Sequence, residues 1–256
     1  MSTVNKLEKF RQNETFACLL QPKMEELFRK DFRLKGKWQS EEFKNTNPIT
    51  LELGCGKGEY TLSLAKLFTN RNFIGMDIKG ARLWKGAKEV EESGIKHVRF
   101  LRTNIDFIEW IYGKDEVSEI WITFADPQLR SPRKRLSGSM FLERYRKFLK
   151  PGGVIHLKTD SRYLHEYTKA LAEQNNLKII CCSTDVYKEA ESTAQPFPKE
   201  LTTVQTFYEQ YFLKMGLPIT YLSFQISNNE PIKEPRWDSD YWLGKENEGR
   251  ILGRIR

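Results

Sequence analysis

The stretch LELGCGKG carries the first residues whose types and spacing could do chemistry. Glycine recurs at Gly54, Gly56 and Gly58 directly after a short apolar run, and the acid Glu52 stands two positions before the first of them. Glycines at this spacing permit tight turns and let a ligand approach the backbone closely. A dinucleotide fingerprint would need a glycine where Glu59 stands, and a phosphate-binding P-loop would need serine or threonine after the lysine.

A second stretch, TFADPQLRSPRKRL, places one carboxylate ahead of a dense run of cations. Asp126 follows an apolar run, and four basic residues come shortly after it: Arg130, Arg133, Lys134 and Arg135. Lys and Arg neutralise phosphates, so we expect these cations to face a polyanion. Asp126 could instead be a polar turn residue before proline.

The overall composition favours a polyanionic partner and excludes some classes of site. The 256 residues carry a net charge of +8, as is common in proteins that bind nucleic acids. The cysteines and histidines lack zinc-ligand spacing, so we expect no metal, reduced thiols and a cytoplasmic location. With no signal-peptide core and no long apolar run, we expect no membrane segment. Nothing indicates an obligatory protein partner.

The elements that must position these residues alternate between apolar strands and helical periods. We predict strands at 49–53, 72–78, 97–101, 118–124, 154–158, 177–183 and 219–226. We predict helices at 57–68, 81–92, 105–112, 138–149, 161–174 and 206–215. This alternation predicts an α/β fold with a seven-stranded, mostly parallel sheet and helices on both faces. The last strand is expected to be antiparallel, because the return after Pro218 leaves no room for a crossover helix.

Polar residues follow the predicted strands at the edge where open α/β sheets bind ligands. Asp77 ends the second strand, where an acid hydrogen-bonds ribose hydroxyls in nucleotide-binding folds. Asn104 and Asp106 follow the third strand, where they could meet an adenine edge. With the glycine motif, this set resembles the Rossmann-like class I methyltransferases that use S-adenosylmethionine. Glu52 would favour the cationic end of that donor by direct attraction.

Five stretches together resemble bacterial tRNA (guanine-N7) methyltransferases in order and spacing: LELGCGKG, GMDI, FADPQLRSPRKRL, GGVIHLKTD and TFYE. The likeness spans about residues 30–226. It implies methyl transfer from S-adenosylmethionine to a guanine N7 in tRNA, in the variable loop, with S-adenosylhomocysteine as product. The implied cofactor-side residues are Glu52, Gly54, Gly56, Gly58, Asp77, Asn104 and Asp126. The implied tRNA-side residues are Arg130, Asp160, Thr206, Phe207, Tyr208 and Glu209.

The chain departs from that family's usual pattern in several places. After the fourth strand, Gln128 replaces tryptophan, Arg130 replaces lysine, and the loop is two residues shorter. Asp77 stands where glutamate is usual and Asn104 where aspartate is usual. Asn104 can still accept a hydrogen bond from an adenine amine through its amide oxygen.

The chemistry implied by the resemblance gives Asp126 a specific role. Guanine N7 carries an in-plane lone pair, so attack on a methyl group needs alignment rather than prior deprotonation. We therefore expect Asp126 to be the principal catalytic carboxylate, acting through positioning and electrostatics. Asp160 and Glu209 are secondary candidates for gripping the base. Asp160 could instead cap the following helix, and Thr206 with Glu209 matches a capping box.

The sequence suggests three parts and leaves other functions open. Residues 1–48 read as a basic N-terminal arm, 49–226 as the methyltransferase domain, and 227–256 as a C-terminal tail, either docked or disordered. In the helix at 206–215 we expect an apolar stripe to face the core: Tyr208, Tyr211, Phe212 and Met215. The alternatives are a non-catalytic RNA-binding module on this scaffold, a methyltransferase acting on another substrate, or a nicotinamide-dependent oxidoreductase.

Overall fold

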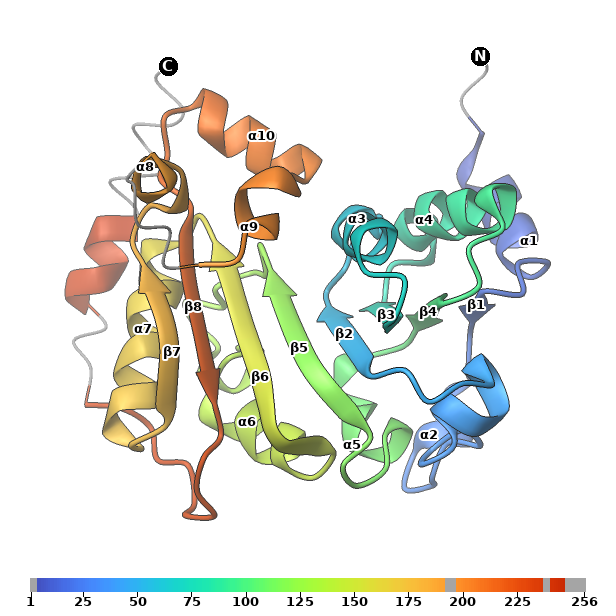
Figure 1. Ribbon diagram of the computed structural model, residues 1–256, viewed down its shortest axis with the longest axis horizontal. Coiled ribbons are helices and arrows are strands. Elements are labelled where there is room, and N and C mark those ends of the chain that lie inside the picture. The colour runs from blue at the N-terminus through green and yellow to red at the C-terminus, as the bar shows by residue number, and fades with distance from the viewer. Residues whose placement is uncertain (1–3, 192–196, 237–239, 247–256) are drawn as a thin grey trace. The chain divides into compact units, whose positions relative to one another are not determined.

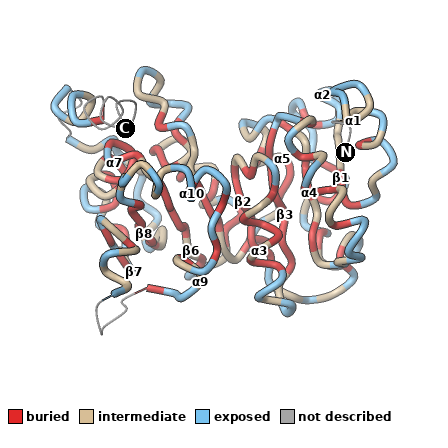
Figure 2. The backbone as a smooth tube through the Cα atoms, turned by 90° about the horizontal axis from the view of Figure 1, so that it is seen from above, coloured by how far each residue is buried: buried red, intermediate tan, exposed pale blue. Residues whose placement is uncertain are grey.

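The computed structural model of the protein describes residues 4–191, 197–236 and 240–246, and the chain divides into two compact units. Unit 1 comprises Met1–Ile120 and Lys147–Lys150, and unit 2 comprises Trp121–Arg146 and Pro151–Arg256. Within each unit the strands are largely buried, as the red segments of Figure 2 show. The chain is therefore an α/β protein, as the sequence predicts.

Unit 1 is built on a parallel sheet in the strand order β1-β4-β3-β2 (Figure 1). The strands are β1 (Leu19–Leu20), β2 (Ile49–Leu53), β3 (Asn72–Asp77) and β4 (Val98–Arg102). Every residue of β2 and β3 is buried, because a parallel sheet is covered on both faces. The parallel pairing brings the carboxyl ends of β2, β3 and β4 to one edge.

The helices of unit 1 match the predicted ranges 57–68 and 81–92, and others occur within 1–48, where the sequence analysis predicts none. They include α1 (Lys6–Asn13), α2 (Met24–Leu27), η1 (Trp38–Phe43), α3 (Glu59–Leu67), α4 (Gly80–Ser93), η2 (Ile105–Phe107) and α5 (Ile108–Ile111). Helix α3 packs against β2, β3 and β4, and α4 packs against β4 and α1. The single helix expected at 105–112 is instead a 3-10 turn, η2, followed by the short α5.

The N-terminal segment, expected to be a basic arm, contributes to the interior of unit 1. Trp38 is fully buried, stacks on Tyr112 with ring centroids 5.6 Å apart, and donates its indole N–H to the carbonyl of Ile111 at 3.1 Å. This segment also supplies β1, which pairs in parallel with β4. The part of the chain that the structure describes therefore has eight strands rather than the seven predicted. A two-residue strand is too short to show any periodicity.

Unit 2 contains the antiparallel part of the fold. Strands β5 (Val117–Thr123) and β6 (Leu149–Thr159) end in this unit, and β7 (Lys178–Ser183) and β8 (Thr220–Gln225) lie wholly in it. Strand β8 pairs antiparallel with both β6 and β7. This arrangement confirms that the last strand is antiparallel.

The helices of unit 2 match the predicted ranges 138–149, 161–174 and 206–215 to within a few residues, and shorter helices occur where none is predicted. They include η3 (Pro132–Lys134), α6 (Ser139–Arg146), α7 (Arg162–Gln174), α8 (Val186–Ala190), α9 (Glu200–Thr203) and α10 (Phe207–Lys214). Helix α7 packs against β7 and β8. Among the described residues, no helix is long and apolar enough to cross a membrane.

The C-terminal tail is docked where the structure describes it. Glu234 accepts hydrogen bonds from the Tyr167 hydroxyl at 2.8 Å and from the Ser139 hydroxyl. Glu246 is buried and accepts from the Tyr163 N–H at 3.2 Å. Of the two alternatives for the tail, docking therefore holds for residues 227–236 and 240–246, whereas 237–239 and 247–256 lie outside the described residues.

Candidate active site

The glycine-rich turn joins β2 to α3 at the carboxyl edge of the unit 1 sheet. Gly56 has a φ of 58°, and a Cβ built there would meet no atom within 4 Å. Gly58 has a φ of 74°, and a Cβ there would overlap the ring of Phe100. Glycine is therefore required at Gly58 for packing, while the turn at Gly56 is open to a ligand.

Asp77 holds this turn from the end of β3. Its Oδ2 accepts from the Gly56 N–H at 2.9 Å, and its Oδ1 accepts from the Lys79 N–H at 2.7 Å. A carboxylate has about four acceptor positions, so Asp77 can fix the turn and still accept from ribose hydroxyls. The structure thus brings Asp77 and the glycine turn together, as the spacing predicts.

Glu52 is buried and contacts the first turn of α3. It accepts from the Thr61 N–H at 2.8 Å and from the Thr61 hydroxyl. Its charge still reaches the glycine turn: burial, and then the charges of Glu52 and Asp77, raise the pKa of the Cys55 thiol well above its usual range. The turn is therefore flanked by two carboxylates, and the thiol within it stays protonated and unreactive.

Asn104 and Asp106 lie together after β4. The Asn104 amide oxygen accepts from the Asp106 N–H at 3.1 Å and caps η2, while its amide nitrogen donates to Asp106 Oδ2 at 3.2 Å. Both side chains are exposed. Because β4 ends at the same edge as β2 and β3, this pair lies at the edge that carries the glycine turn.

Asp126 belongs to unit 2 and lies on an exposed loop after β5. Its Oδ1 accepts from the Gln128 N–H at 2.8 Å. Phe124 and Gln128, on either side of it, both have a φ of 50°, in the left-handed region that non-glycine residues rarely adopt. The loop thus presents a carboxylate from a strained backbone, a combination that clusters at functional sites.

The four cations after Asp126 differ in exposure, which corrects the expectation that all of them face a polyanion. Arg130, Arg133 and Lys134 are exposed. Arg135 is 3% exposed, and its guanidinium donates to the Pro127 carbonyl at 3.2 Å. Only three of the four cations are therefore placed to meet a phosphate backbone.

Asp160 follows β6, and the sequence analysis offers two roles for it: gripping the base or capping the following helix. Helix α7 is capped by Ser161, whose hydroxyl accepts from the Leu164 N–H at 3.1 Å. Asp160 is therefore not the capping residue. Its side chain is half-buried at the carboxyl end of the strand.

Thr206 and Glu209 form a capping box, which the sequence analysis gave as the alternative to substrate binding by these two residues. The Thr206 hydroxyl accepts from the Glu209 N–H at 3.2 Å, and Glu209 Oε2 accepts from the Thr206 N–H at 3.4 Å. Glu209 has no exposed surface. In this structure both residues fix the start of α10.

A buried lysine completes this arrangement and was missed by the sequence reasoning. Lys158 Nζ lies 2.6 Å from Glu209 Oε1, and both side chains are fully buried. The ammonium also donates to the carbonyls of Leu201 at 2.6 Å and Val204 at 3.1 Å, and the Tyr187 hydroxyl donates to Glu209 at 2.8 Å. Burial lowers the pKa of Lys158, and the Glu209 charge opposes that shift. The sequence feature that could have indicated this buried charge is the single lysine in the predicted strand VIHLK.

Helix α10 exposes two of the four residues expected to form a core stripe, while Phe212 and Met215 are half-buried. Tyr208 and Tyr211 are 51% and 53% exposed, and Phe207 is 59% exposed. Phe212 packs against Phe124 with ring centroids 6.1 Å apart. The expectation of a buried stripe is therefore wrong for both tyrosines, because the capping box and the Lys158 pair anchor the helix through Glu209 instead.

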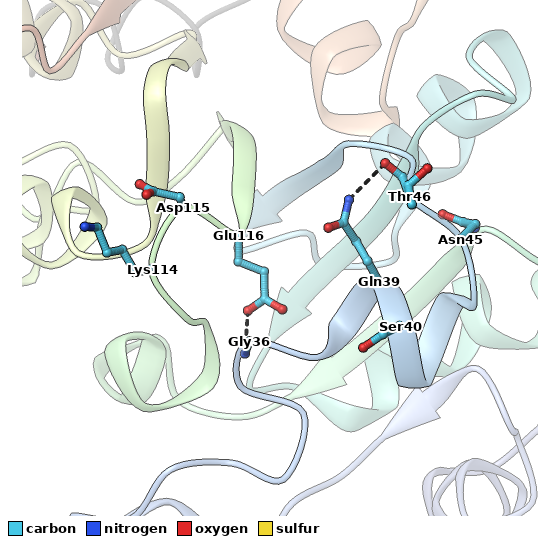
Figure 3. A pocket seen from close by; sticks show the side chains of 8 residues that line it. All are labelled: Gly36, Gln39, Ser40, Asn45, Thr46, Lys114, Asp115 and Glu116. Atoms are coloured by element: carbon cyan, nitrogen blue, oxygen red, sulfur yellow. Dashed lines mark hydrogen bonds between the residues drawn. The ribbon is translucent and has the colours of Figure 1, made fainter.

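Two hollows are lined by residues outside the predicted site residues. One, of about 340 Å³, lies beside the segments that precede β2 and β5 in unit 1; Figure 3 shows Glu116 directed at the Gly36 N–H and Gln39 at Thr46. A second, of about 560 Å³, is lined in unit 2 by Arg162, Thr184, Asp185, Lys188, Glu189 and Pro218. Within the described ranges, no group of three or more His, Cys, Asp or Glu side chains is placed to hold a metal ion.

Solved structures with a similar fold are methyltransferases. The 16S rRNA methyltransferase KamB aligns with a TM-score of 0.55 at 12% identity, over 78% of this chain and 96% of that one. A second structure, described as an antibiotic-related methyltransferase, aligns with a TM-score of 0.54 at 17% identity, over 76% and 95% of the two chains. At these identities the likeness concerns the fold alone.

Sequence comparisons identify the family. A family model described as "Putative methyltransferase" matches residues 46–222. A tRNA (guanine-N(7)-)-methyltransferase of Christiangramia forsetii is 50% identical over 88% of this chain and all of its own length. Its counterpart in Bacteroides fragilis is 45% identical over 90% of this chain and 89% of its own, and that of Clostridium acetobutylicum is 33% identical over 80% and 89%. With such matches across nearly its whole length, the chain belongs to the tRNA (guanine-N(7)-)-methyltransferase family.

Proposed function

We propose that this chain transfers the methyl group of S-adenosylmethionine to N7 of a guanine in the variable loop of tRNA, leaving S-adenosylhomocysteine. One observation carries the proposal: a glycine turn open above Gly56 and flanked by two buried carboxylates. That turn belongs to a chain 50% identical to a relative named tRNA (guanine-N(7)-)-methyltransferase.

The residues at the unit 1 edge suit a donor of this chemistry. S-adenosylmethionine supplies a methyl group on a positively charged sulfur. Glu52 and Asp77 provide negative potential at the turn, which favours the sulfonium and the amino group. Asp77 accepts from ribose hydroxyls, and Asn104 with Asp106 faces the adenine edge. Gly54, Gly56 and Gly58 let the donor approach the backbone, while Glu52 also fixes the start of α3.

Asp126 acts on the transfer without serving as a strong base. Guanine N7 attacks through its own lone pair, so no proton has to leave first. As positive charge spreads over the purine, the N1–H and N2–H groups become better hydrogen-bond donors. A carboxylate that accepts from that edge, or that holds the amino group of the donor, stabilises the transition state more than the ground state. The exposed Asp126 carboxylate is suited to either contact.

Of the remaining substrate-side residues, some contact the tRNA and others hold the first turn of α10 in place. Arg130, with the exposed cations of η3, docks the tRNA backbone, and Asp160 contacts the guanine. Phe207 and Tyr208 offer exposed rings on which an RNA base can stack. Thr206 and Glu209 support these contacts from beneath by fixing the first turn of α10.

The organisation and location of the enzyme are also proposed. We infer that residues 49–226 form the methyltransferase domain, that 1–48 and 227–256 are its flanking arm and tail, and that it works in the cytoplasm without an obligatory protein partner. The free thiols of Cys18, Cys55, Cys181 and Cys182 suit a reducing compartment. Full activity of the purified chain alone would support the absence of a partner, and activity that depended on a second protein would contradict it.

The direct test is methyl transfer from radiolabelled S-adenosylmethionine to bulk tRNA. Digestion to nucleosides should place the label in 7-methylguanosine, and partial nuclease digestion should place that nucleoside in the variable loop. Label in another nucleoside would contradict the proposed reaction. Label in 7-methylguanosine outside the variable loop would contradict only its proposed location.

A further inference from the structure

One cation of the run that follows Asp126 is built into the protein. Arg133 and Lys134 are exposed on η3, whereas Arg135, the next residue, is 3% exposed. A guanidinium is rarely buried unless its donors are satisfied. The contacts of Arg135 therefore show what it does.

The Arg135 guanidinium bridges a loop and a helix of unit 2. Its Nε donates to the Pro127 carbonyl at 3.2 Å, and its Nη2 donates to the Leu129 carbonyl at 3.4 Å and to the Tyr163 hydroxyl at 2.7 Å. Its plane lies over the rings of Tyr163 and Tyr167, with centroid distances of 4.9 and 4.4 Å. In the described part of the chain no carboxylate forms an ion pair with it, so carbonyls and rings stabilise its charge.

The loop that Arg135 grips is the strained loop that carries Asp126. Its two carbonyl partners belong to the residues on either side of Gln128, which has a φ of 50°. Gln128 also donates its N–H to the Asp126 carboxylate at 2.8 Å. A left-handed conformation at such a residue persists only where the surroundings hold it. Arg135, which follows η3 and packs against Tyr163 and Tyr167 of α7, supplies that hold.

We propose that Arg135 is a positioning residue for methyl transfer, which fixes the Asp126 loop and does not bind RNA. The inference rests on the function proposed above for Asp126. Arginine suits the role because its rigid fork reaches two carbonyls at once and its flat face stacks on rings. Lysine keeps the charge but offers one compact ammonium, which cannot reproduce both contacts.

The test compares Arg135→Lys with Arg133→Met as the matched exposed neighbour. For each variant, the single-turnover rate is measured at saturating tRNA and donor, and the tRNA dissociation constant is measured across a salt series. Arg135→Lys is expected to lower the rate at least tenfold, with tRNA affinity within twofold and an unchanged salt slope. Arg133→Met is expected to weaken tRNA binding and flatten the slope. A rate for Arg135→Lys within twofold of the unsubstituted enzyme would overturn the proposal.

A double-mutant cycle tests whether the effect runs through Asp126. If it does, adding Arg135→Lys to Asp126→Asn changes the residual rate less than twofold. A full tenfold further loss would show that Arg135 acts by another route and would overturn the positioning role.

Two controls keep the result decisive. Thermal melting shows whether Arg135→Lys folds; if it does not, Tyr163→Phe, which removes only one acceptor, decides the question. That variant is expected to lose at least threefold in rate at unchanged tRNA affinity, and an unchanged rate would overturn the proposal. If the unsubstituted enzyme makes no 7-methylguanosine, the proposed function fails, whereas an active parent with undisturbed variants contradicts only the role of Arg135.

Discussion

The two units use their charged residues in opposite ways. In unit 1, Glu52 and Asp77 are buried; Asp77 accepts from a backbone N–H of the glycine turn, and Glu52 accepts from one in the first turn of α3. In unit 2, Asp126 and Arg130 are exposed on a strained loop. Two buried cations of unit 2 support these elements: Arg135 hydrogen-bonds the loop, and Lys158 pairs with Glu209 of helix α10. An edge fixed by buried carboxylates thus contrasts with an exposed carboxylate and arginine whose loop is held by buried cations.

The largest expected effect comes from removing the support under α10. Lys158→Met leaves Glu209 charged, buried and without its cation, so we expect the free energy of unfolding to fall by about 3–5 kcal/mol. Chemical denaturation measures this. Adding Glu209→Gln should restore part of the loss because the unpaired charge disappears. A loss below about 1 kcal/mol for Lys158→Met would show that the pair does not support unit 2.

The second expected effect is a loss of stability in acid, caused by the buried His165 on α7. Burial lowers the pKa of His165 from 6.5 to about 4, with smaller influences from Glu166, Arg162, Lys169 and Glu189. Between these two values the unfolded chain binds more protons than the folded one, so stability falls as the pH drops from about 6.5 to about 4. This difference in pKa corresponds to about 3 kcal/mol in the free energy of unfolding.

Replacing the histidine provides the control. Denaturation at a series of pH values should show a shallower decline for His165→Gln across that window. An identical decline in the variant would mean that other groups cause the acid sensitivity.

A smaller effect is expected for Gly58 in the glycine turn, with Gly36, which lies outside the turn and has the same backbone angle, as the control. Gly36 and Gly58 both have a φ of 74°, but a Cβ at Gly36 meets nothing within 4 Å, whereas one at Gly58 overlaps Phe100. Gly58→Ala should cost about 2 kcal/mol more stability than Gly36→Ala, since only the first adds overpacking to backbone strain. Equal losses in thermal melts would contradict the packing role assigned to Gly58.

The smallest effect concerns tRNA docking by the exposed cations. The double variant Arg133→Met, Lys134→Met should weaken tRNA binding by about 1–2 kcal/mol and reduce the salt slope by about 1.5. A variant with the same charge loss in unit 1, Lys66→Met with Lys88→Met, removes lysines that pair with Glu89 and Glu92. If both variants change the slope equally, net charge rather than a local contact is responsible.

The sequence predicted much of unit 1 because its signals are local. Apolar runs and helical periods located β2, β3, β4, α3 and α4, and the glycine spacing predicted that Asp77 would lie beside the turn, at the expected donor edge. The hydrogen bond from the Gly56 N–H to Asp77 shows that the two lie together, and their binding of the donor stays a prediction. Strand β1 escaped because two residues carry no period.

Unit 2 was harder to predict because its key features depend on tertiary contacts. A run of four cations reads as a solvated patch, and only the approach of α7 buries Arg135. Tyr208 and Tyr211 read as a core stripe, yet α10 is anchored through Glu209. A lone lysine in an apolar strand gave no indication that Lys158 would meet that acid 51 residues later.

The central claim is that the Asp126 carboxylate stabilises the transition state of methyl transfer. Its most direct test is the single-turnover rate of Asp126→Asn at saturating tRNA and S-adenosylmethionine, with thermal melting as the control. Because the side chain is exposed, we expect an unchanged melting temperature and a rate lower by about 10²–10³-fold. A stably folded variant that transfers methyl groups at nearly the rate of the unsubstituted enzyme would contradict the account.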